Sequence, residues 1–151
     1  PLMSRRYSID GRDTNTSATT ILGLTSAATV RPKIFDIQIY SAATPADNAG
    51  EYYFQRYTAA GTATAVTPQT IDTADPVALA SAGEAHTVEP TYTANAILLS
   101  LGGNQRATLR WLAVPGAELV LPAVAANGVG CLVAQIAGSA VQMSICIHFI
   151  E

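Results

Sequence analysis

The pair of residues best placed to do chemistry lies near the end of the chain. Cys146 and His148 are two residues apart in a segment where apolar and polar residues alternate. Side chains two residues apart in a β-strand lie on one face, about 7 Å from each other. A thiol and an imidazole on one face are two parts of a nucleophilic site. We favour the plainer interpretation, in which the pair lies on the outer face of a sheet, or in an interface, without a chemical role.

The other groups of possible metal ligands are incomplete. His86 lies between Glu84 and Glu89, and we interpret this grouping as a solvated loop. Residues 10–15 are similar to a calcium-binding loop, but Arg12 occupies the third position, where calcium requires an oxygen ligand. We therefore predict no catalytic residue, no metal site and no cofactor.

Composition narrows the class of protein. The chain has 151 residues and a net charge of −3, and only 13% of its residues are charged, against about 25% in typical soluble domains. An acidic balance argues against nucleic-acid binding, and no apolar run of about 20 residues is present to span a membrane. A surface so poor in charge suits a protein that packs against neighbours.

The ends and the cysteines of the chain lead to two smaller expectations. We expect no signal peptide, because charged and polar residues follow Met3, and we interpret Pro1 and Leu2 as a remnant ahead of the natural start. Cys131 and Cys146 are too few for a disulfide framework or a structural zinc site. Whether the two cysteines pair is left open by the sequence.

A period of two runs through most of the chain and predicts strands. In residues 34–40 one face carries Phe35, Ile37 and Ile39. Residues 141–149 alternate in the same way, and further strands are expected at residues 21–24, 51–58, 62–70, 96–101, 106–113, 118–121 and 129–136. One short helix is expected at residues 76–81, with Asp75 as its cap and Pro76 at its first position.

About eight strands with frequent turn signals predict an all-β fold. Two antiparallel sheets packed as a jelly-roll β-sandwich are the arrangement that fits this count. Residues 8–20 are polar and contain little that could fill a core. We therefore expect residues 1–29 to form an extended N-terminal arm with a first short strand, and residues 30–151 to form the jelly-roll domain.

Arginines and tyrosines are the candidates for contact with a partner. Arginines gather in the first fifth of the chain, where an arm could pair with acidic groups of another protein. Tyrosines occupy both faces of the strand expected at residues 51–58, so one face is available to a partner. The predicted contact residues are Arg5, Arg6, Tyr7, Arg12, Tyr52 and Tyr53.

Five segments of the second half carry a resemblance to a known family. They are residues 86–99, 104–111 (NQRATLRW), 115–122 (PGAELVLP), 126–130 and 148–151. In order and spacing they resemble the small jelly-roll proteins that are encoded beside the major capsid protein of tailed bacteriophages and that decorate, or cement, the capsid. The matching motifs are strands and turns, and they cover somewhat under half of the chain.

The resemblance implies a structural role and no enzymatic one. It implies a homotrimer that binds the major capsid protein at local threefold positions on the capsid exterior, after synthesis in the cytoplasm of the bacterial host. An alternative is a carbohydrate- or receptor-binding jelly roll of the head-fibre type, in which Asn48, Tyr52 and Tyr53 would face the ligand. A cupin-like metal enzyme would need two or three histidines with a glutamate, and the two histidines here are far apart in sequence.

Overall fold

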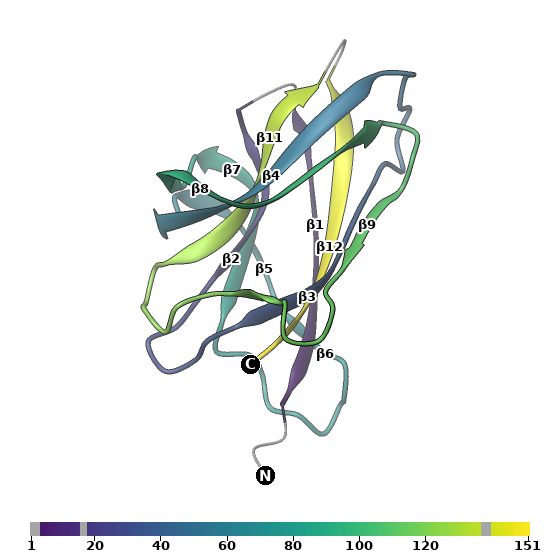
Figure 1. Ribbon diagram of the computed structural model, residues 1–151. Coiled ribbons are helices and arrows are strands. Elements are labelled where there is room, and N and C mark those ends of the chain that lie inside the picture. Colours follow the sequence, from purple (N-terminus) through teal and green to yellow (C-terminus); the bar gives the residue numbers. More distant parts are fainter. Residues whose placement is uncertain (1–3, 16–17, 137–139) are drawn as a thin grey trace.

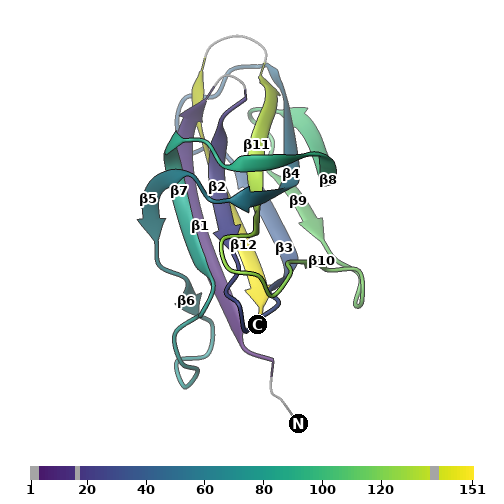
Figure 2. The same cartoon turned by 90° about the vertical axis from the view of Figure 1, so that its left-hand side faces the viewer.

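Two antiparallel β-sheets pack face to face in the computed structural model of the chain (Figure 1). The structure describes residues 4–15, 18–136 and 140–151, and these residues form twelve strands and no helix. Pro1 and Leu2, which we interpret from the sequence as a remnant, lie outside the described residues. Figure 1 shows the two layers side by side, and Figure 2 looks onto one sheet with the other behind it.

The first sheet, sheet A, contains both ends of the chain. Its strands follow the order β10 (Leu119–Val120), β3 (Lys33–Tyr40), β12 (Val141–Ile150), β1 (Arg6–Asn15) and β6 (Gln69–Thr70), and β9 (Leu109–Leu112) also pairs with β3. The second sheet, sheet B, follows the order β5 (Thr62–Val66), β7 (Ser81–Val88), β2 (Thr20–Thr25), β11 (Gly128–Ile136), β4 (Ala49–Ala59) and β8 (Thr91–Asn104).

The strand order is that of a jelly roll, as the sequence predicts. Strands β1, β12, β3 and β9 are neighbours in sheet A, and β2, β11, β4 and β8 are neighbours in sheet B. Each strand of the first half therefore pairs with one from the second half, which is the result of wrapping one long hairpin into two sheets. The segment between β4 and β8 is extra, and it adds β5, β6 and β7 to the edges of both sheets.

The core lies between the sheets and follows the alternation in the sequence. In β12, the expected inward set from Val141 to Phe149 is buried, while Cys146 and His148 are half-buried on the outer face. Phe149 stacks on Tyr7 of the neighbouring strand, with ring centroids 5.4 Å apart. Apolar side chains from both sheets complete the core, chiefly Ile9, Ile21, Leu22, Leu24, Ile34, Ile37, Ile39, Tyr52, Phe54, Leu121, Val129 and Val133.

The predicted facing of residues 34–40 is wrong at one position. Phe35 is half-buried on the outer side, against the ring of His148, and Ile34 is buried in its place. The cause is an irregularity in the ladder, since the register between β3 and β12 shifts between His148 and Phe149. A bulge of this kind moves the side chains beyond it to the opposite face.

The expectation of an extended N-terminal arm is wrong. Residues 6–15 form β1, which lies between β12 and β6 and pairs with β12 along its whole length. The polar composition of this segment is tolerated because Tyr7 and Ile9 supply its large inward side chains and Gly11, the next inward position, has no room for one: a Cβ there would lie only 2.7 Å from Leu22 Cδ1. Residue 29 therefore does not separate an arm from a domain.

The expected helix at residues 76–81 is also wrong. Residues 71–80 form a looped segment without regular structure, and β7 begins at Ser81. The backbone groups of this segment are satisfied by distant partners, because the Pro76 carbonyl accepts from Tyr7 OH and the Leu79 amide donates to Glu151. Tertiary hydrogen bonds therefore override a local helix signal.

Substituting Ile9 tests whether β1 belongs to the core. Ile9 is 1% exposed, so Ile9→Ala is expected to lower the free energy of unfolding by about 2–5 kcal/mol, from lost burial and a new cavity. The measurement is urea denaturation followed by circular dichroism. Val77, which is 78% exposed, gives the control, and Val77→Ala is expected to change stability by less than about 0.5 kcal/mol. If the two variants are equally stable, Ile9 does not pack in the core and the interpretation of this segment as an arm holds.

Candidate functional sites

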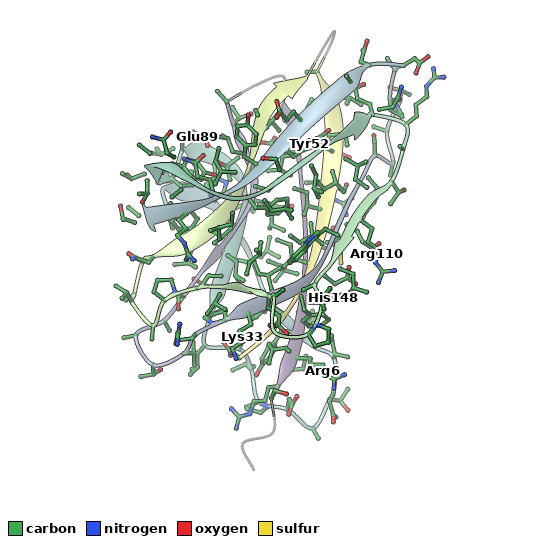
Figure 3. The ribbon with its side chains drawn as sticks, viewed as in Figure 1. Arg6, Lys33, Tyr52, Glu89, Arg110 and His148 are labelled. Atoms are coloured by element: carbon green, nitrogen blue, oxygen red, sulfur yellow. The ribbon has the colours of Figure 1, made fainter. Side chains whose placement is uncertain are left out.

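A row of polar side chains crosses the outer face of sheet A and contains the predicted Cys146–His148 pair. Cys146 Sγ lies 3.7 Å from His148 Nε2 and 3.8 Å from Ser8 Oγ. These residues come from the neighbouring strands β12 and β1, where Ser8 is paired with His148. The two side chains therefore share one face, as the spacing predicts, and Figure 3 shows His148 on the side of sheet A that carries Arg110.

Asp36 extends this row and is its most buried member. His148 Nδ1 lies 3.6 Å from Asp36 Oδ2, and Arg110 donates to both carboxylate oxygens, at 3.0 Å from Nε and 2.8 Å from the terminal nitrogen. The Asp36 side chain is 5% exposed and that of Arg110 is 55% exposed. A bidentate guanidinium is the geometry that best compensates a buried carboxylate.

The thiol in this row is not activated. Burial raises the pKa of Cys146, and the nearby carboxylates of Asp10 and Asp36 act in the same direction, while the contact with Ser8 opposes them. Nucleophilic cysteines require the thiolate at neutral pH. The hydrogen bonds from Arg110 to Asp36 raise the pKa of the guanidinium, so this ion pair stays charged. The row is therefore best described as a polar brace that joins β3, β9 and β12.

A small pocket lies on the outer face of sheet B beside His86. It has a volume of about 250 Å³, and its lining includes Gly23, Thr25, Tyr57, Gly61, Ser81 and His86. The Tyr57 and Thr25 hydroxyls are 2.6 Å apart, and burial raises the pKa of Tyr57 to about 12. Burial lowers the pKa of His86, and its Nδ1 has no hydrogen-bond partner among the described residues. The described lining of the pocket therefore contains no charged side chain, and alanines and glycines form most of it beside the hydroxyl and imidazole groups.

The two glutamates near His86 in sequence are engaged elsewhere. Glu84 accepts a hydrogen bond from the Arg12 amide at 2.6 Å. Glu89 accepts from both the amide and the hydroxyl of Thr20, which is fully buried. Within the part of the chain that the structure describes, no group of three histidine, cysteine or acidic residues is placed to hold a metal ion.

A larger cleft lies at the end of the sandwich where β1 begins and β12 ends. Its volume is about 770 Å³. It is lined by Ser4, Arg5, Val30, Arg31, Lys33, Ala74, Asp75, Pro76, Ile150 and Glu151. Lys33 and Arg6 lie in one row across sheet A, because each is paired with Ile150. Figure 3 shows Arg6 and Lys33 at this same end of the molecule.

The residues predicted to contact a partner separate into exposed and buried groups. Arg5, Arg6 and Arg12 are exposed, and Tyr53 is half-buried. Tyr7 and Tyr52 are 0% and 1% exposed. Their side chains lie in the core, so for these two the prediction is wrong: the inward alternation of β1 and β4 takes both rings away from the surface.

Sequence reasoning missed the residues that complete two of these sites. Asp36 stands at a position that the alternation assigned to the solvent face, and its pairing with His148 and the diagonal neighbour Arg110 make it a buried ion-pair partner. The sequence shows Arg31 and Lys33 on either side of a proline, but that they line one cleft with Arg5 depends on how the sheet closes. The two cysteines are free, and burial raises the pKa of Cys131 well above its usual value.

Comparison with known proteins returned no family model, no curated protein and no solved structure that matches this chain. Among the described residues, no helix has the length and apolar character needed to cross a bilayer. The fold and the geometry of its surfaces therefore carry the functional argument.

Alkylation of Cys146 tests whether its row is inert. Because burial raises the pKa of this thiol, its thiolate fraction at pH 7 is expected to fall below that of free cysteine and to rise as the pH increases. Iodoacetamide labelling followed by mass spectrometry is therefore expected to be slower than for glutathione at pH 7. His148→Gln is expected to leave the rate within about twofold of the parent. Rapid labelling at pH 6 that disappears in this variant would instead identify a thiolate–imidazolium pair.

Proposed function

We propose that this chain is a structural virion protein that decorates and stabilises the capsid of a tailed bacteriophage by binding the major capsid protein as a homotrimer. The proposal rests on the resemblance of the second half to capsid decoration proteins and on one feature of the structure. That feature is an apolar, uncharged edge of the sandwich.

Strand β8 carries this edge. It is the last strand of sheet B, and residues 91–104 contain no charged side chain. An edge strand presents unpaired amide and carbonyl groups to a second chain, and proteins that avoid such pairing place charges or prolines along it. Ile97 in this strand is 41% exposed, and Leu98, Leu99 and Leu101 are only partly buried against the core.

The β9 side of the sandwich continues the same apolar character. Leu109 and Trp111 pack against the core while remaining partly accessible. Leu112 is 59% exposed and Val114 is 72% exposed. Apolar and aromatic side chains with few charges are the composition of subunit interfaces, so this side supports association with further copies of the chain.

A trimer with a shell-binding face suits the physics of cementing. A cement protein adds interface area between capsomers, and it needs a stiff scaffold rather than a reactive cleft. Three weak contacts carried by one trimer reinforce one another through their effective concentration. A jelly roll supplies that stiffness, because its two sheets share one continuous core.

A charge placed on β8 tests the assembly. The parent protein is expected to show the mass of a trimer in size-exclusion chromatography with light scattering. Ile97→Glu is expected to shift the protein to the monomer mass without loss of its β-sheet circular dichroism, because a buried unpaired charge opposes association. Val124→Glu, at a site that is 50% exposed in the β10–β11 loop, is the control and is expected to stay trimeric. A monomeric parent at micromolar concentration contradicts the proposal.

Sedimentation with empty expanded shells tests the target. The parent protein is expected to pellet with shells of the major capsid protein and to raise the temperature at which they rupture. Unexpanded shells and a shell-free sample are the controls. Failure to sediment at saturating concentration contradicts the proposed function.

A second candidate function is suggested by the pocket beside His86. The hydroxyl and imidazole groups in this cavity of about 250 Å³ are of the kind that bind a carbohydrate, at a site other than the Asn48, Tyr52 and Tyr53 face of the carbohydrate-binding alternative; Tyr52 is buried. Binding on a glycan array, lost in Tyr57→Phe and retained in Tyr53→Phe, would favour this candidate. If no glycan on the array is bound, carbohydrate binding is contradicted.

A further inference from the structure

The cations of this acidic chain are concentrated at one end. Arg5, Arg6, Arg31 and Lys33 are four of its eight basic residues, and three of them line the cleft at the end of the sandwich. Ion pairing within the described residues leaves these three free, since the pairs formed there join Asp36 to Arg110 and His148. The cleft lining thus holds three cations against two carboxylates, those of Asp75 and Glu151, on a protein whose net charge is −3.

One of the two carboxylates in the cleft lining, that of Glu151, is occupied by backbone donors. The Glu151 carboxylate accepts hydrogen bonds from the Leu79 amide at 2.6 Å and from the Ala80 amide at 3.1 Å. Backbone donors thus compensate its charge and direct it toward the 71–80 segment. An anion that enters the cleft therefore meets Arg5, Arg31 and Lys33, which form no ion pair among the described residues.

Both walls of the cleft are held by hydrogen bonds to the sandwich. On one side, Tyr7 OH donates to the Pro76 carbonyl at 3.0 Å, and the Ile71 amide donates to the Arg6 carbonyl at 2.9 Å. On the other side, Ser26 Oγ donates to the Val30 carbonyl, and the Leu121 amide donates to the Pro32 carbonyl. The ordering cost of binding is reduced when the walls are fixed in advance.

An apolar rim adjoins the basic lining. Ile71, Val77 and Leu79 are 51%, 78% and 58% exposed on the 71–80 segment, beside the cleft residue Pro76. The half-buried Ile150 contributes to the floor. The cleft thus combines basic groups with apolar contacts, which is a pairing that suits a peptide segment rather than a bare anion.

We infer that this cleft is the docking site for an acidic segment of the shell protein, with carboxylates directed at Arg5, Arg31 and Lys33 and an apolar side chain on the rim. This inference rests on the proposed function, and it supplies the chemistry of the partner surface. The volume of about 770 Å³ lies within the range of sites that hold short ligands. Arginine pairs with carboxylates in a bidentate manner, so such a contact is directional as well as attractive.

A nucleic acid fits the same end less well. A phosphate backbone requires a continuous basic track, and the carboxylates of Asp75 and Glu151 interrupt the positive lining. The net charge of −3 repels a long polyanion. A short acidic stretch avoids this repulsion because it reaches only the basic end.

Fluorescence polarisation with a labelled peptide tests the cleft directly. The probe is a fluorescein-labelled decapeptide that alternates glutamate and leucine. The double variant Arg31→Glu, Lys33→Glu is expected to bind at least tenfold more weakly than the parent. The double variant Arg106→Glu, Ala107→Glu gives the control: both residues are exposed and lie outside the cleft lining, and this variant is expected to bind within twofold of the parent. A lysine–leucine decapeptide is expected not to bind.

Three results of this assay overturn the inference. They are equal binding by the cleft and control variants, tighter binding of a single-stranded DNA 20-mer than of the acidic peptide, and undiminished binding in 0.5 M NaCl. Circular dichroism of both variants establishes that they are folded, since all four substituted positions are exposed.

Sedimentation with expanded shells separates this inference from the proposed function. If the parent pellets with the shells and the Arg31→Glu, Lys33→Glu variant does not, although it remains trimeric, both hold. If both pellet equally, the shell protein docks elsewhere and the inference fails while the proposed function stands. If the parent does not pellet, the proposed function fails, and the inference fails with it whatever the peptide does.

Discussion

The pairing of the first strand with the last is the contact on which the rest of this structure depends. β1 and β12 are aligned without a register shift from Arg6 opposite Ile150 to Asn15 opposite Val141. This ladder lies in the middle of sheet A, and the β1 and β12 side chains Tyr7, Ile9, Ile145, Ile147 and Phe149 fill one side of the core. Sheet A is therefore incomplete until the last residues of the chain are in place.

The same closure creates the two polar features of sheet A. On its outer face it brings Ser8 to Cys146 and continues the row through His148 to Asp36, which Arg110 holds by two hydrogen bonds. At its end it brings Arg5 and Glu151 together by reciprocal backbone hydrogen bonds, and so gathers the cleft around them. The first feature braces the sheet, and the second presents charge to a partner.

Sheet B contributes a different kind of surface. Its edge strand β8 is long, uncharged and partly apolar, and the neighbouring β9 carries exposed apolar side chains. A side suited to copies of the chain and an end suited to an acidic partner are thus separated on one rigid scaffold. Under the proposed function, such a separation would let self-association and shell binding occur together, as multivalent attachment requires.

The sequence by itself determined the all-β class, most of the strands and the inward residues of β12. These are local properties, because a period of two and turn residues are visible within a few positions of one another. The same local reasoning interpreted residues 8–20 as an arm and residues 76–81 as a helix. Residues 8–20 are polar when considered alone, but their partner strand β12 lies at the other end of the chain. Residues 76–81 begin with a helix-start signal, but the Leu79 amide donates to Glu151, which is also distant in sequence.

Only the tertiary structure decided which functional groups meet. The placing of Cys146 and His148 on one face follows from their spacing, whereas their link to Asp36 depends on the register between β12 and β3, which the periodicity of either strand does not reveal. The burial of Tyr7 and Tyr52, and the union of Arg5 with Arg31 and Lys33, likewise depend on how two sheets close. In a jelly roll each neighbour comes from a distant part of the chain, so long-range pairing rather than local preference sets every surface of this protein.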